Sequence, residues 1–319
     1  MKAVNLSCAG SNGNTGIQSC AWDPKNITGA ILLPTGTSYD STAVATMYAT
    51  LQASAKADSP SDRIYPIGLF KSIEDKSTDV QIETDGYGGK SFVRDGDYDW
   101  MFEYKNGFCF YKALRTFHNK QQSFVVMFID EVNNVLWGTT DSNGDLTGFS
   151  LELLIVPNIK INTGSNATKY YIEFGLSNPT ELNDNSYIVQ LAANQQLTKL
   201  TGLLDTTITA TTTLDGTTTG DVTVTLTSAC GAVDLAELYP TELADITPGP
   251  AFQIYNLTNP GAVAITGIAV VGSDITITTN LANTAPGDIV TIYFGDVSDM
   301  EAVSIFGYAE SNTVNVTVV

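Results

Sequence analysis

Positive charge is missing from the C-terminal part of this 319-residue chain. All lysines and arginines lie between Lys2 and Lys199. The first 199 residues carry 15 basic and 21 acidic residues, a net charge of −6, and the remainder carries 13 acidic residues and no basic one. Because phosphates repel a surface of this sign, the total charge of −19 argues against sequence-independent binding to nucleic acid or to an anionic membrane.

Charged residues of either sign are few. They make up 15% of the chain, against roughly 25% in an ordinary soluble domain, while Thr, Ser, Asn and Gly are plentiful. So little charge is typical of a surface that meets other protein. No window of about 18 apolar residues exists, and the start, Met1 to Cys8, lacks the apolar core of a secretory signal. We therefore expect a protein that is made in the cytoplasm and does not cross a membrane.

Cysteine and histidine are scarce and poorly placed for chemistry. The cysteines have no C-x-x-C spacing and no neighbouring histidine, which excludes the usual zinc patterns: Cys8, Cys20, Cys109 and Cys230. We predict free thiols. The single histidine, His118, lies at a predicted helix end, and no G-x-S-x-G motif supplies a nucleophile for it. No catalytic residue, metal or cofactor is predicted, and we do not expect an enzyme.

Two acidic runs resemble calcium loops. The run from Asp95 to Asp99 begins like an EF-hand, but Trp100 and Asn106 stand where glycine and glutamate are required, so it is interpreted as the polar face of a strand. The run from Asp141 to Glu152 has the terminal glutamate but Leu146 in place of the glycine. A hairpin turn is favoured there, with calcium binding as the alternative.

The change in composition after Lys199 predicts a domain boundary, with domains at 1–200 and 201–319. The second domain reads as seven short strands separated by turns, interrupted by a helical turn or two at 234–244. Several strands alternate threonine with Val, Ile or Leu, so each would bury one face. This pattern predicts an immunoglobulin-like (Ig-like) β-sandwich, with strands expected at 208–213, 221–227, 252–257, 263–270, 274–279, 289–294 and 313–318.

The first domain is predicted to be an antiparallel β-sandwich or barrel with two helices, at 41–56 and 109–117. It lacks the alternation of strand and helix that a parallel sheet requires. Strands are expected at 63–70, 78–84, 97–104, 123–129, 135–139, 147–156 and 168–176. A glycine-rich stretch, Gly10–Gly16, has no phosphate-binding motif and is interpreted as an N-terminal arm.

The stretch from Ile64 to Trp100 mixes aromatic and acidic residues. Hairpins of this composition pack either on their own core or on a neighbouring subunit. The candidate contacts to another subunit are Tyr65, Phe70, Tyr87, Phe92 and Trp100. The acidic residues of the stretch before its Gly86–Gly89 turn are Glu74, Asp75, Asp79, Glu83 and Asp85.

This order of elements, with a mixed β block before a lysine-free Ig-like block, resembles the major tail tube proteins of long-tailed bacteriophages. The runs Ile64–Gly68, Tyr87–Lys90 and Val93–Asp99 are also similar to segments of phage structural proteins. The resemblance implies a virion protein, assembled in the host cytoplasm, that forms stacked and usually hexameric rings. Its partners would be copies of itself, the tape-measure and other tail proteins, and duplex DNA that passes without specific binding.

In such a tube, acidic residues lining the channel would repel the phosphates of passing DNA. The acids between Glu74 and Asp85, or those from Asp95 to Asp99, are the candidates. The Ig-like block would point outward as a decoration. The alternatives are another virion component, such as a head-decoration or tail-terminator protein, or an Ig-bearing adhesin that binds carbohydrate or a cell surface.

Overall fold

A computed structural model describes residues 4–6, 27–68, 70–130, 134–162, 164, 167–192, 195–215, 218–228, 233–247 and 250–319. The chain divides into two compact units: unit 1 is Met1–Ala55 and Ser61–Thr201, and unit 2 is Lys56–Pro60 and Gly202–Val319. The main boundary lies next to the change in composition, but the segment Lys56–Pro60 belongs to unit 2, which the sequence did not predict. The predicted mainly-β, antiparallel fold is confirmed.

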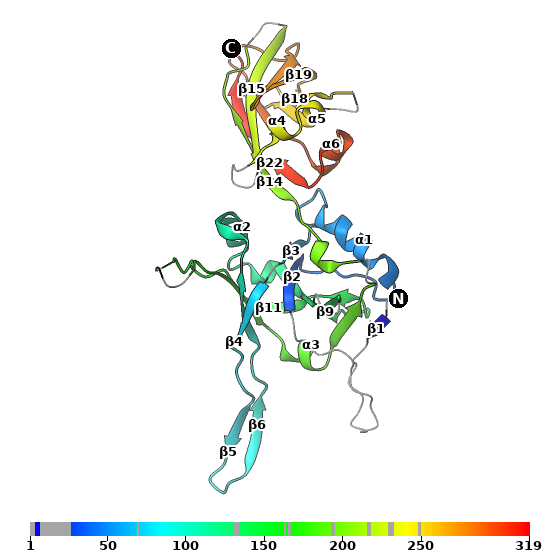
Figure 1. The fold of residues 1–319 in the computed structure, drawn as a ribbon, viewed down its shortest axis with the longest axis vertical. Helices are drawn as coiled ribbons and strands as arrows, with labels where there is room; N and C mark the ends of the chain where they lie inside the picture. Colours follow the sequence, from blue (N-terminus) through cyan, green and yellow to red (C-terminus); the bar gives the residue numbers. More distant parts are fainter. Residues whose placement is uncertain are drawn as a thin grey trace. The chain divides into compact units, whose positions relative to one another are not determined.

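Unit 1 is built on one long, folded antiparallel sheet (Figure 1). Its strand order is β1 (Val4–Leu6), β13 (Ser186–Gln190), β9 (Val135–Thr140), β8 (Phe124–Asp130), β11 (Phe149–Ile155), β12 (Tyr170–Leu176), β7 (Asp99–Tyr104) and β4 (Phe70–Asp75). In addition, β2 (Ile27–Pro34) pairs with β8 and with β3 (Tyr65–Ile67), and β10 (Leu146–Thr147) pairs with β9. Strand β11 pairs with β8 through its first residues and with β12 through the rest, so it joins the two halves of the sheet.

The two halves enclose an aromatic core. Phe102 of β7 and Phe174 of β12 contact Phe128 of β8, with ring centroids 5.8 and 5.9 Å apart. Residues of β7 alternate between the core and the opposite face, as period-two alternation requires. The other face of β2, β8 and β9 is covered by helix α1 (Val44–Ala55), which buries Val44, Met47 and Leu51.

Unit 1 departs from the sequence prediction at several elements. Strand β2 was not predicted, because it is buried on both faces and therefore shows no alternation. The expected strand at 63–70 is divided between β3 and β4, and β13 was not expected. Besides α1 and α2 (Gly107–Arg115), unit 1 contains a third helix, α3 (Pro179–Asn183), whose first turn is capped by Asn178. The 3-10 turns η1 (Gln121–Ser123) and η2 (Leu197–Lys199) complete it.

Unit 2 is a two-sheet sandwich. One sheet has the order β19 (Ile265–Val271), β20 (Asp274–Asn280), β15 (Thr219–Ser228), β14 (Leu204–Ala210) and β22 (Tyr308–Ser311), with β16 (Val233–Asp234) beside β15. The other has the order β18 (Gly261–Ala262), β17 (Phe252–Asn256), β21 (Ile289–Phe294) and β23 (Val314–Thr317). Taken in chain order, these are the A-B-E-D and C-F-G sheets of an Ig sandwich.

The core of unit 2 lies between these sheets, where Leu226 and Ile277 of one meet Ile254 and Phe294 of the other. The helical turns expected near residue 240 are α4 (Leu235–Leu238) and α5 (Pro240–Ala244). Helix α6 (Val297–Ala302) and strand β22 were not predicted. Among the described residues, no helix combines the length and apolar character needed to cross a membrane.

The prediction of free thiols is wrong for Cys109, which is disulfide-bonded. The spacing of the cysteines did not indicate this, because their separation along the chain does not determine which of them meet in space. Cys8, Cys20, Cys230 and the glycine-rich stretch Gly10–Gly16 lie outside the described residues.

Candidate assembly surface

A two-stranded hairpin, formed by β5 (Gln81–Thr84) and β6 (Lys90–Arg94), extends from unit 1. We call Thr78 to Asp97 the arm. It continues the direction of β4 and β7 away from the body of unit 1, and every residue from Thr78 to Asp95 is exposed (Figure 1). An isolated hairpin is at best marginally stable in water. An arm of this kind therefore gains stability when another surface covers it.

The two faces of the arm differ in chemistry. Ile82 lies opposite Phe92, and their exposed fractions are 58% and 65%. Val80, just before β5, and Val93, next to Phe92 on β6, are also exposed. The next pair, Glu83 opposite Ser91, occupies the other face. The arm therefore carries an exposed apolar pair on one face and a polar pair on the other.

The tip of the arm is ordered by Asp85. Its Oδ1 accepts hydrogen bonds from the backbone N–H groups of Tyr87 and Gly89, at 2.9 and 2.7 Å. Gly88 has φ of 82°, a conformation that favours glycine. These bonds place the Tyr87 side chain fully in solvent, with a relative exposure of 103%. The turn thus presents an aromatic side chain at the far end of the arm.

The predicted contact residues fall into two groups. Phe70 and Trp100 are buried in the core of unit 1, where Phe70 stacks on Phe102, so their assignment to a contact surface was wrong. Tyr65 is half-buried and packs edge-on against Phe117. Tyr87 and Phe92 lie on the arm and remain predicted contacts. Large aromatic side chains are more often buried in a core than exposed. The sequence alone did not show which of these aromatic residues lie on the arm.

The predicted channel acids do not form one cluster. Glu74 and Asp75 lie at the end of β4, Glu83 lies on β5, and Asp79 and Asp85 lie before β5 and at the tip. All five are exposed. They extend along β4 and the arm from its root to its tip, and whether they line a channel remains a prediction.

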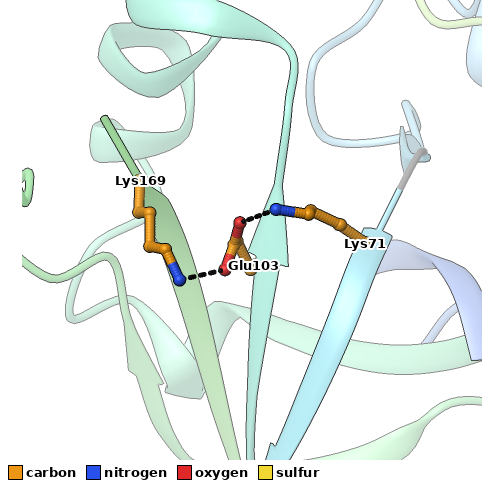
Figure 2. Close-up of polar contacts among 3 residues, drawn as sticks. All are labelled: Lys71, Glu103 and Lys169. Carbon is orange, nitrogen blue, oxygen red and sulfur yellow. Dashed lines mark hydrogen bonds and ion pairs between the residues drawn. The ribbon is translucent and has the colours of Figure 1, made fainter. Parts of the chain in front are cut away.

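The outward face of the half-sheet β11-β12-β7-β4 carries a charged cluster that sequence reasoning missed. Glu103 of β7 lies between Lys71 of β4 and Lys169, which precedes β12, at Nζ–Oε distances of 3.0 and 3.2 Å (Figure 2). The side chain of Glu103 is only 8% exposed. Burial alone would raise its pKa, but the hydrogen bonds from the two lysines outweigh burial and hold the pKa below its usual value. The alternation of β7 is the one sequence signal that could have placed Glu103 on the face opposite the core. Only the pairing of β7 with β4 and β12 brings the two lysines beside it.

The root of the arm carries a second charged cluster. Lys76, just after β4, donates to Glu173 of β12 at 2.9 Å, and Asp99 lies at the start of β7. Burial, and next the charge of Glu173, raises the pKa of Asp99 to about 6. Only Asp99 of the run Asp95–Asp99 lies in a strand, so the strand interpretation of that run holds for this residue alone.

Glycine is required at the arm root. A Cβ atom at Gly96 would lie 1.8 Å from the carbonyl oxygen of Thr78. This close approach permits the backbone bond from Thr78 N–H to the Asp97 carbonyl, 2.9 Å long. At the point where the arm leaves the sheet, the backbone at Gly96 therefore lies directly against the backbone at Thr78.

The remaining candidate residues have structural contacts. His118 Nδ1 accepts a hydrogen bond from the Val156 N–H at 3.1 Å, beside β11. Asp141 Oδ1 accepts from the N–H groups of Asn143 and Asp145, which makes the predicted hairpin turn between β9 and β10. No group of three or more potential metal-binding side chains occurs among the residues that the structure describes.

No protein-family model matches this chain, and no curated protein is similar to it. Its function is therefore inferred from the geometry of the chain itself.

Proposed function

We propose that this chain is a self-assembling virion protein, a subunit of a phage tail tube built from stacked rings. The observation that carries the proposal is the arm, which exposes Val80 and the cross-strand pair Ile82 and Phe92. Contiguous apolar side chains on a protruding element mark a surface that another protein covers. A second copy of the chain is the partner that a self-assembling subunit always has available.

The edge of the sheet supports the same proposal. Strand β4 ends the strand order of unit 1, and its residues from Lys71 to Asp75 are exposed. An exposed edge strand presents unpaired backbone groups to other chains. Lys71, Glu74 and Asp75 on this edge would disfavour indiscriminate pairing and would restrict it to a partner of complementary charge.

The charge of unit 2 fits an outward decoration. Residues 200–319 carry 13 acidic residues and no basic one, so copies of unit 2 repel each other and anionic polymers. Self-assembly would then depend on unit 1, where all the lysines and arginines lie except Lys56.

Electron microscopy of the purified chain tests this function. We expect rings or short tubes whose amount rises with protein concentration. Phe92→Asp, which places a charge on the apolar face, should abolish them. Ser91→Asp is the matched control, because it adds the same charge to the neighbouring position on the polar face. A strictly monomeric wild-type chain at all concentrations, or equal loss in both variants, would contradict the proposal.

One observation favours a second candidate, an adhesin-like binding module. Tyr255 and Leu257 at β17 and Ile289 of β21 are exposed, on the sheet of unit 2 that corresponds to C-F-G. Saturable binding of the chain to a glycan array, lost in Tyr255→Ala, would favour this candidate. An array without hits would eliminate it, and self-assembly would then be the one proposed function.

A further inference from the structure

We propose that the arm of one copy docks on the opposite end of unit 1 in a second copy, which joins subunits head to tail along the strands of the half-sheet β11-β12-β7-β4. We call this opposite end the basic end, and it consists of Lys105, Phe108, Lys112, Lys160, Ile161 and Lys169. The inference rests on the proposed function, because it names the surface that covers the arm during self-assembly.

Strand pairing places the arm and the basic end at opposite ends of the same strands. Tyr104, the last residue of β7, lies opposite Phe70, the first residue of β4, and Tyr170, the first residue of β12. Lys105 continues the chain beyond this end, and Lys169 precedes β12. The root of the arm lies at the other end, about 17 Å away along the six residues of β7 (Figure 1). Each end can therefore contact a different copy of the chain.

Ring contacts and a backbone bridge hold the basic end together. Tyr111 of α2 contacts Tyr170 with ring centroids 5.8 Å apart, which fixes α2 against the start of β12. Phe108, on the preceding turn of α2, stacks on Tyr111 at 6.1 Å. Lys160 and Lys169 exchange two backbone hydrogen bonds, of 3.2 and 2.9 Å. Residues from α2 and from the chain before β12 thus share one end of the half-sheet.

The two ends differ in the sign of their charge. Residues 104–123 and 157–169 contain six lysines and arginines and no acidic residue, whereas the arm contains five acidic and two basic residues. Within the described part of the chain, no ion pair occupies Lys105, Lys112 or Lys160. These positive charges are available to an acidic partner, and the arm of another copy is such a partner.

Exposed apolar side chains accompany the charges at both ends. Phe108 and Ile161 are 56% and 76% exposed, and the arm exposes Ile82 and Phe92. Apolar contacts surrounded by complementary charges are typical of the contact between two proteins. A phosphate polymer would use the lysines but not Ile161, and the net charge of −19 on the chain opposes its approach.

The charges favour this contact over the pairing of two arms. Two arms that met through Ile82 and Phe92 would bring two acidic surfaces together, and like charges repel. An arm on a basic end is a heterologous contact, in which each subunit uses two different surfaces. Every added copy leaves one arm and one basic end free. The contact therefore repeats and aligns all subunits in the same direction, as stacking of rings requires.

Charge reversal at each end tests the contact, with assembly measured by sedimentation velocity over a range of concentrations. Glu83→Lys reverses an exposed acid of the arm, and Lys105→Glu reverses an exposed base of the basic end. Each variant alone should need about tenfold more protein for half-assembly, because an attraction becomes a repulsion. An equimolar mixture should assemble close to the wild-type concentration, since the reversed arm of one variant meets the reversed basic end of the other. Recovery in the mixture also shows that both variants are folded.

Lys199→Glu is the matched control, because it makes the same change of charge at an exposed lysine of η2, outside both surfaces, and it should assemble as wild type. Normal assembly of Lys105→Glu, or no recovery in the mixture, would overturn the head-to-tail contact and leave self-assembly standing. A wild-type chain that stays monomeric would instead contradict the proposed function and the contact with it. The two failures are therefore distinguishable.

Discussion

The Lys71–Glu103–Lys169 cluster supports a quantitative prediction about unit 1. The perturbation is Lys71→Met and Lys169→Met, made singly and together, because methionine keeps most of the apolar stem of lysine. The lysine side chains are 47% and 39% exposed, so solvent screens each ion pair. We expect each single substitution to lower the free energy of unfolding by about 1 kcal/mol, since Glu103 keeps one partner.

The double variant should lose more than the sum of the single variants. Glu103 would then be a nearly buried carboxylate without a cation, and a buried charge that has lost its partner costs about 3–5 kcal/mol. Allowing for the partial exposure of the site, we expect a loss of about 3–4 kcal/mol, hence a coupling of roughly 1–2 kcal/mol. The loss should shrink toward about pH 4, where the unpaired carboxylate can take up a proton.

Denaturant unfolding monitored by tryptophan fluorescence is the assay. Trp22, Trp100 and Trp137 all lie before residue 199, so the signal reports unit 1 and not unit 2. Lys112→Met, on the exposed side of α2, is the control and should change stability by less than about 0.5 kcal/mol. Adding Glu103→Gln to the double variant should restore part of the loss. The reasoning would be refuted if the losses of the two single variants simply added in the double variant and Glu103→Gln restored none of the lost stability.

Packing and composition support two further predictions. Phe128→Ala, at the centre of the aromatic core, should lower the free energy of unfolding of unit 1 by about 3–5 kcal/mol. Tyr87→Ala, at the arm tip, should change it by less than about 0.5 kcal/mol in the same fluorescence transition. Similar losses in the two variants would contradict the placement of either residue. Limited trypsin digestion should leave an intact fragment from Leu200 to Val319, detected by mass spectrometry, because Lys199 is exposed and no lysine or arginine comes after it. Cleavage by a protease of broad specificity inside that fragment, at the same rate as in the arm, would show that unit 2 is not a stable fold.

The candidate site was only partly predictable. The sequence indicated that the stretch between Ile64 and Trp100 is unusual, but it did not separate core aromatics from exposed ones. Trp100 and Phe92 have similar chemistry, yet one faces Phe128 across the sandwich and the other lies on the arm. The difference depends on where β7 ends and the arm begins. That position is fixed by strand pairing with β4 and β12, which involves residues far apart in the chain.

The β-rich class, the change of chemistry after Lys199 and the seven principal strands of unit 2 could be predicted from the sequence, because alternation, turns and charge are local properties that each segment carries with it. Three contacts became visible only in the folded chain: Glu103 is held by two lysines, Lys76 pairs with Glu173, and Cys109 is disulfide-bonded. Each of these contacts joins residues that are distant in the sequence. The register of the strands and the folding of the chain bring these residues together, and no pattern within a short segment of sequence specifies such a contact.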